Sequence, residues 1–253
     1  MIVVDTHLHL YDEYDWSEAL RGCVGRLSAL APQAVCAGVL VDRFGQGNFR
    51  ALTEGRKRLE QDFSIRVLDE GKCIKIQSPV VAPLYLFAGR QIVTAERLEI
   101  LCLGVDADIP DGLAADIAVR RIREVGGIAV LTWAVGKWLF ARAKVVQKLL
   151  SEFTPDELLL GDSAMRPIFW PQPKPMRWAV REHRVILAGT DPLPAAGEER
   201  VMGSFASLLK MEFDETNALA SLNSGIFTAG SMPKSVGRRS GVVPFIRRMA
   251  NSL

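Results

Sequence analysis

The residues best suited to chemistry lie at the start of the chain, where two of its three histidines are one residue apart. His7 and His9 follow a short apolar run at residues 2–4. In an extended strand alternate side chains point to the same side, so the two imidazoles are expected to project together. A pair of neutral imidazoles is half of a site for a first-row divalent metal ion. The alternative is a chance pair in which each ring is merely hydrogen-bonded.

Apolar runs that follow along the chain predict the elements that position this pair. Runs at residues 2–7, 35–42, 128–133, 158–161 and 185–190 are typical of buried parallel strands, and helical patterns separate them. Repeated strand, loop and helix predict a closed parallel sheet, and α/β barrels place their chemistry at the carboxyl ends of the strands. The predicted fold is therefore α/β, a single-domain, distorted TIM-like barrel of the (β/α)7 type. It covers residues 1–253, with 203–253 as a C-terminal helical and basic extension.

The middle of the chain is less regular. Alternating residues at 63–68 and 72–77 predict a β-hairpin, and further apolar segments lie at 84–89 and 98–103. The predicted helices cover residues 17–31, with Ser17 as the N-cap, 49–61, with Asn48 as the N-cap, and 112–125, 137–153 and 176–182.

Composition narrows the class of protein. The net charge of +2 argues against a general polyanion binder, so we expect nucleic acid not to be the partner, without excluding it. Four scattered cysteines without a CxxC spacing indicate buried thiols in a reducing compartment. No apolar run is long enough to span a membrane, and the chain opens on a strand, not on a signal peptide. We therefore expect a cytoplasmic protein with no membrane partner; its oligomeric state is left open.

Three segments resemble the polymerase and histidinol phosphatase (PHP) superfamily of metal-dependent phosphoesterases. Residues 5–9, DTHLH, resemble its opening D-x-H-x-H motif, and residues 124–133 resemble its glycine pair followed by an apolar strand. Residues 185–191, which end in Gly-Thr-Asp, are similar to its terminal G-S-D segment, and a weaker match lies at 39–42. The resemblance covers about residues 1–193 by order and spacing. It implies a seven-stranded barrel with up to three metal ions.

The chain departs from this family at five expected ligand positions. They hold Arg43, Gln91, Leu101, Trp133 and Leu193 instead of histidine or glutamate. A multinuclear site is therefore not expected.

The ligands that remain belong, in the family, to one metal position. They are His7, His9 and Asp191, a set that suits one Zn²⁺, Mn²⁺ or Fe²⁺ ion and leaves room for water. Four residues are candidates for a fourth ligand: Gln91, Glu96, Glu99 and Asp162.

Charged and aromatic residues near the predicted strand ends are candidates for catalysis and substrate binding. Asp162, or one of Glu96 and Glu99, would act as the general base, and Arg43, Lys137 or Arg166 would offset phosphoryl charge. The candidate substrate-binding residues are Arg90, Trp133 and Arg166. For each charged residue the competing interpretation is a solvated charge or a turn cap, and for Trp133 it is core packing.

Two functions from different classes follow. The first is a metal-dependent hydrolase, a phosphoesterase that acts on a small phosphorylated or anionic substrate. The second is a catalytically degenerate barrel that has become a binding or scaffold protein, because so many of the family's ligands are replaced. A stoichiometric amount of metal bound to the purified protein would favour the hydrolase.

Overall fold

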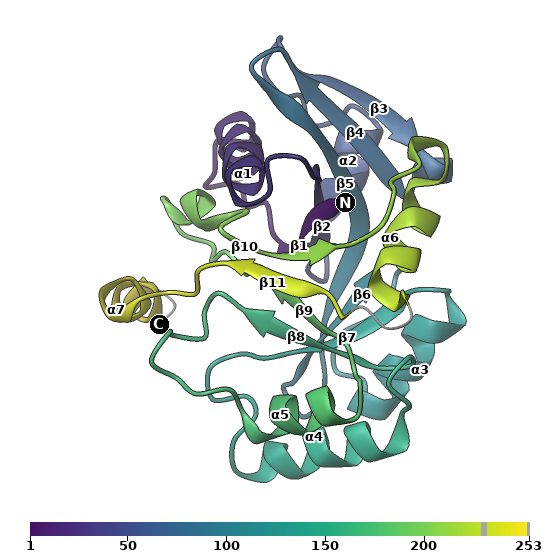
Figure 1. The fold of residues 1–253 in the computed structure, drawn as a ribbon, viewed down its shortest axis with the longest axis vertical. Helices are drawn as coiled ribbons and strands as arrows, with labels where there is room; N and C mark the ends of the chain where they lie inside the picture. The colour runs from purple at the N-terminus through teal and green to yellow at the C-terminus, as the bar shows by residue number, and fades with distance from the viewer. Residues whose placement is uncertain (229–231, 252–253) are drawn as a thin grey trace.

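The computed structural model describes residues 1–228 and 232–251 of the chain. Its centre is a barrel-shaped, nearly closed sheet with helices around it, a distorted TIM-like barrel in a single domain (Figure 1). The strands in hydrogen-bonded order are β11 (Lys234–Gly237), β10 (Phe205–Leu209), β1 (Ile2–Leu8), β2 (Val35–Asp42), β5 (Val81–Val93), β6 (Glu99–Leu103), β7 (Ile128–Thr132), β8 (Leu159–Ser163) and β9 (Ile186–Gly189). The helices are α1 (Trp16–Leu30), α2 (Asn48–Thr53), α3 (Ala115–Glu124), α4 (Ala141–Glu152), α5 (Lys174–Arg181), α6 (Ala218–Phe227) and α7 (Val242–Asn251).

The five predicted strands all run in one direction. β1 pairs with β2 and β2 with β5 in parallel, and β7, β8 and β9 form a second parallel group. The expectation of a parallel sheet in which these five strands are neighbours is wrong at one place, because β5 and β6 lie between β2 and β7. β6 lies between β5 and β7 and is antiparallel to both, because a short turn and not a helix leads into it from β5.

The predicted hairpin in the middle of the chain is confirmed. β3 (Ser64–Leu68) and β4 (Cys73–Ser78) pair antiparallel, and β4 continues the sheet onto β5. The segment from residue 203 onward is not only helical, because β10 pairs antiparallel with β1 and β11 with β10. No helix in residues 1–228 or 232–251 is long and apolar enough to cross a membrane.

Two predicted helix starts differ from the structure. Asp15 caps α1 by accepting from Glu18 N, while the hydroxyl of Ser17 accepts from Glu60 N. α2 ends at Thr53, ahead of Gly55 with its φ of +68°, and the Asn48 amide donates to Leu10 O instead of capping the helix. In each case the side chain that the local pattern predicts as the N-cap forms a hydrogen bond with a residue distant in the sequence instead.

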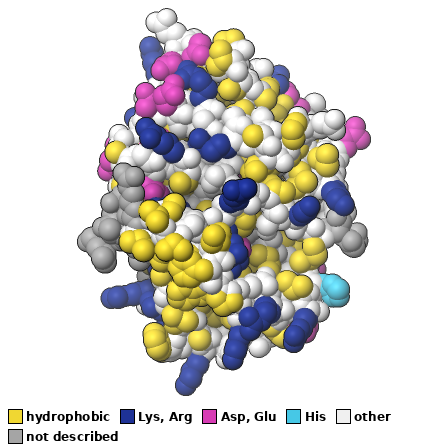
Figure 2. All heavy atoms as spheres, turned by 60° about the vertical axis from the view of Figure 1, so that its left-hand side comes forward, with side chains coloured by type: hydrophobic (Ala, Val, Ile, Leu, Met, Phe, Trp, Pro, Cys, Tyr) yellow, Lys and Arg dark blue, Asp and Glu magenta, His cyan; other side chains and the backbone are white. Residues whose placement is uncertain are grey.

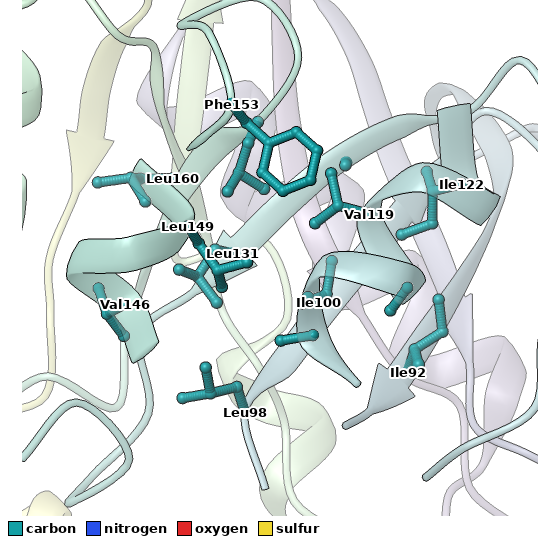
Figure 3. Packing of buried hydrophobic residues seen from close by; sticks show 14 of the residues in the cluster. Ile92, Leu98, Ile100, Val119, Ile122, Leu131, Val146, Leu149, Phe153 and Leu160 are labelled. Carbon is teal, nitrogen blue, oxygen red and sulfur yellow. The ribbon is translucent and has the colours of Figure 1, made fainter. Parts of the chain in front are cut away.

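Apolar side chains fill both faces of the sheet. Ile2 and Val4 point into the barrel, where Leu222 and Ile226 of α6 also pack, so this helix covers one end of the barrel. On the outer face, α3 and α4 lie against β6, β7 and β8 (Figure 3). Ile100 and Leu131 lie among the labelled side chains there, which are buried. Removing each from water stabilises the fold by roughly 1.5–3 kcal/mol.

Candidate metal centre

A local irregularity in β1 aims the two histidines into the barrel. Val3 packs on the outer face and Val4 on the inner face, so simple alternation would leave His7 on the outside. The register between β1 and β2 shifts between Asp5 and Leu8, as in a β-bulge, and Leu8 packs on the outer face. A bulge reverses which residues of a strand face inward. His7 and His9 therefore point to the interior and are each 2% exposed.

Buried hydrogen bonds join the end of β9 to β1 beside these histidines. Asp191 N donates to His7 O at 2.9 Å. The carboxylate of Asp5 accepts from Thr190 N at 2.9 Å, from the Thr190 hydroxyl, and from Gly203 N at 2.9 Å. These bonds place residue 191 next to residue 7, although 184 positions separate them in the sequence.

Four side-chain atoms converge at this junction. His7 Nε2 lies 3.1 Å from His9 Nε2, 2.9 Å from Gln91 Oε1 and 3.5 Å from Asp191 Oδ1. His9 Nε2 lies 3.8 Å from the same Asp191 oxygen. Ligand atoms at about 2.0–2.1 Å from a tetrahedral zinc ion are about 3.3 Å apart, so the spacing suits one ion. His7, His9 and Asp191 could hold a metal ion.

The protonation of these groups also fits a cation. Burial and the neighbouring His7 lower the pKa of His9 to about 3, so its ring is neutral at pH 7. Although burial opposes it, the two histidines lower the pKa of the Asp191 carboxyl, which is therefore ionised. A hydrogen bond across the 3.1 Å contact needs a hydrogen on one Nε2 atom, whereas a shared metal ion needs a lone pair on each. The oxygens of Gln91 and Asp191 also direct lone pairs to this point, an arrangement that a bound cation stabilises.

The backbone of Asp191 is in an unusual conformation. Its φ is +52°, in the left-handed region that residues other than glycine adopt at a cost. Arg248 of α7 donates from Nη2 to the Asp191 carbonyl at 2.8 Å and pairs with the buried carboxylate of Glu198 at 2.8 Å. The C-terminal helix therefore holds the segment that presents the carboxylate.

A pocket of about 440 Å³ opens onto these ligands. Three residues that the sequence predicted for catalysis, Arg43, Glu99 and Lys137, line it together with Gln91. Glu99 and Lys137 form an ion pair at its edge. Because β6 runs antiparallel, its first residue, Glu99, lies at the rim where the parallel strands end.

The other predicted site residues lie outside this pocket. Asp162 and Arg166 form a buried two-bond ion pair, at 2.7 and 2.5 Å, so neither oxygen of Asp162 is free. Arg90 donates to the carbonyls of Asp42, Gln91 and Ile109 and is 5% exposed. Trp133 is 3% exposed and packs in the core. Of the candidate fourth ligands, Gln91 is the one that reaches the histidines, whereas Glu96 caps the first turn of α3 at Ala115 N.

Sequence reasoning missed several residues of the pocket. Tyr11 lines it and its ring lies 5.6 Å from that of His9, while burial raises the pKa of its hydroxyl. The spacing His7, His9, Tyr11 continues the alternation of the first strand and was the available signal. The apolar wall consists of Ala134, Val135, Met165, Leu193 and Pro194, of which only Leu193, at a ligand position of the family, gave a signal in the sequence.

The fold and site thus define a nearly closed α/β barrel with a group of residues at one end that can hold a metal ion. No family model and no curated protein matches the sequence. Similar solved structures include PsfC from Pseudomonas syringae PB-5123, with a TM-score of 0.60 at 12% identity over 99% of this chain and 96% of that one.

Two endonuclease Q structures are also similar. The lesion-specific endonuclease from Pyrococcus furiosus matches with a TM-score of 0.50 at 10% identity, over 92% of this chain and 57% of its own. An endonuclease Q complex with a 27-mer duplex that carries an abasic lesion at the active site has the same TM-score and identity, over 91% and 57%. The chain thus spans little more than half of the endonuclease, and these likenesses show a shared fold.

Proposed function

We propose that this protein is a metal-dependent phosphoesterase that uses one divalent ion, Zn²⁺, Mn²⁺ or Fe²⁺, held by His7, His9 and Asp191. The observation that carries the proposal is the convergence of these three residues, with Gln91, in a pocket that also holds two cationic side chains. The resemblance of residues 5–9 and 185–191 to the PHP superfamily supports it. A fold shared with an endonuclease is compatible with it.

Each residue of the pocket has a role in this reaction. A bound divalent ion would supply Lewis acidity toward a phosphoryl oxygen and toward water. Arg43 binds the remaining phosphoryl oxygens, and Lys137 offsets the negative charge that develops on them. Glu99 accepts the proton of the attacking water, a role for which Asp162 is less suited because Arg166 occupies both of its oxygens. The substrate we expect is a small phosphorylated molecule, because the volume suits one.

The four cysteines are free and buried, which agrees with our proposal of a reducing, cytoplasmic location.

The test combines metal analysis with an activity panel. Protein purified without chelator is analysed for bound metal and then assayed on phosphate monoesters and diesters with Mn²⁺, Zn²⁺ and Mg²⁺. We expect about one ion per chain and turnover of activated monoesters first, because one ion offsets less charge than several. His9→Ala should lose metal and at least about 100-fold in rate. His183→Ala is the matched control, since the third histidine is exposed at the end of α5, and it should change neither.

The alternative, a barrel that binds or scaffolds without catalysis, is favoured by one observation. Leu101, where the resemblance implies a histidine, is 1% exposed and packs in the barrel core, so no further metal position exists there. If the panel is silent, and metal neither binds nor raises the melting temperature, this alternative replaces the phosphoesterase.

A further inference from the structure

An exposed apolar patch lies beside the metal centre. We call it the α7 patch; it consists of Ile168, Phe169, Val242, Val243 and Ile246, which are 57%, 55%, 50%, 75% and 61% exposed. Phe169 also packs edge-to-face on Phe245 at 6.1 Å, and Ile168 N donates to Ser240 O, so the loop and the helix form one surface. Figure 2 brings the side of α7 forward and shows hydrophobic side chains gathered on it. A contiguous group of large apolar side chains that are half or more exposed is typical of an interaction site.

The α7 patch is connected to the mouth of the pocket. Met165, three residues before Ile168, lines the pocket. From the other side, α7 carries Arg248, which binds the backbone of the metal ligand Asp191. Anything that docks on the patch therefore lies next to the opening through which a substrate enters.

The segments that build the patch are strongly basic. Residues 163–181 and 232–253 hold nine of the 31 Lys and Arg residues of the chain and no Asp or Glu. Arg166 and Arg248 are paired internally with Asp162 and Glu198. Among the described residues, Lys174, Arg177 and Arg238 are exposed and have no ion pair. Figure 2 shows Lys and Arg side chains around the gathered hydrophobic ones, so this face is apolar at its centre and cationic around it.

We propose that the α7 patch docks on an anionic lipid surface and so presents the pocket to phosphate esters held there. A short helix with exposed aliphatic side chains and basic flanks suits the headgroup boundary of a bilayer. Such docking needs no membrane-spanning segment, and the sequence predicts none. Docking on lipid does not depend on catalysis. That the pocket acts on phosphate esters at the lipid surface rests on the proposed function.

Two other partners fit the patch less well. A second copy of the chain would bring two positive surfaces together, which is unfavourable. Nucleic acid would use the basic residues, but four of the five patch residues are aliphatic, and only Phe169 offers a flat π-face on which a base could stack. The combination of aliphatic and cationic side chains is the one that anionic lipids match.

Sedimentation with vesicles tests the proposal with the full chain. We expect the protein to pellet with phosphatidylglycerol–phosphatidylcholine vesicles and to remain in solution with phosphatidylcholine alone. Raising the salt concentration should weaken the binding, because each cation near the surface contributes about fivefold to the affinity. His9→Ala should pellet as the unmodified protein does, so that failure of catalysis and failure of docking are distinguished.

A pair of matched double variants locates the contact. Val243→Glu with Ile246→Glu should weaken vesicle binding at least about tenfold, because both side chains leave the bilayer boundary and two negative charges enter it. The control is Val67→Glu with Val125→Glu, two exposed valines elsewhere, each 47% exposed. It should bind within twofold of the unmodified protein, and both variants should keep its melting temperature.

Three results would overturn the proposal. The first is equal binding by the two double variants, and the second is no vesicle binding at low salt. The third is a change in partner: if Val243→Glu with Ile246→Glu abolishes a dimer in sedimentation velocity, or binding to duplex DNA, while vesicles are ignored, the patch serves that partner instead.

Discussion

Replacing Gly189 by alanine tests whether close contact between the first and last parallel strands builds the metal centre. A Cβ at residue 189 would lie 2.5 Å from His7 Cβ and 2.7 Å from His7 N. Ordinary contacts between carbon atoms are about 3.5–4.0 Å, so the strands must separate by about 1 Å. We expect overpacking to cost about 1–3 kcal/mol in the free energy of unfolding.

The effect on metal binding should exceed the effect on stability. Metal–ligand distances vary by only about 0.2 Å in working sites, so a shift of about 1 Å moves Asp191 out of reach of an ion shared with His7 and His9. Urea unfolding with and without Zn²⁺ measures both quantities. The unmodified protein should gain about 2.7 kcal/mol when free Zn²⁺ is 100 times its dissociation constant, and Gly189→Ala should gain almost nothing.

The control is Gly25→Ala in α1, where a Cβ would meet no atom within 4 Å. It should stabilise the protein by roughly 0.5–1 kcal/mol through helix propensity and leave the zinc effect unchanged. Full zinc stabilisation in Gly189→Ala would refute the reasoning, because it would mean that the ion does not need residues 7 and 191 in contact.

Substitutions at the ligands, at Asp42 and at Arg166 have defined outcomes. His7→Ala and Asp191→Asn should each remove the metal while the chain stays folded, as measured by metal content and circular dichroism; unchanged content in either would mean that the ligands are different. Burial raises the pKa of Asp42 from 3.8 to about 6, so its ionisation destabilises the folded state as the pH rises from about 4 to 6. Asp42→Asn should therefore gain roughly 2–3 kcal/mol relative to the unmodified protein between pH 4 and pH 7, and parallel stability curves would contradict this. Arg166→Met leaves the carboxylate of Asp162 buried and unpaired, and should lower the free energy of unfolding in urea by about 3–5 kcal/mol. Adding Asp162→Asn to this variant should restore part of that free energy.

Apolar periodicity was enough to predict five of the parallel strands and the hairpin, but not β10 and β11, which lie in the segment predicted to be a helical and basic extension. The runs at 35–42 and 128–133 are continuous because both faces of those strands are covered, and the alternation at 63–68 reflects a strand with solvent on one side. The direction of β6 could not be read in this way. Its apolar run is the same in either direction, and only the length of the connection to β5 decides.

The candidate site was predicted in part. His7 and His9 were identified by their spacing, but the bulge that aims them inward depends on the pairing of β1 with β2, which the sequence does not show. Arg166 and Trp133 have the residue types of a substrate site, yet Arg166 is buried in an ion pair with Asp162, four residues away, and Trp133 is buried in the core. The residue type alone does not indicate whether a side chain is already paired or packed with other residues of the folded chain.

The distance along the chain between the two halves of the metal centre sets the order of events during synthesis. His7 and His9 leave the ribosome long before Asp191, whose carboxylate and backbone N–H reach them, and before Gly203, whose N–H donates to Asp5. At about 5–20 residues per second, that interval is about 10–40 s. During it, the histidine pair is exposed to every metal ion in the compartment and belongs to no closed site. An ion held by these three residues would therefore be selected only after β9 has been made, by the folded barrel and the metals then available to it, and a ribosome-bound chain truncated before residue 186 should exchange any metal freely.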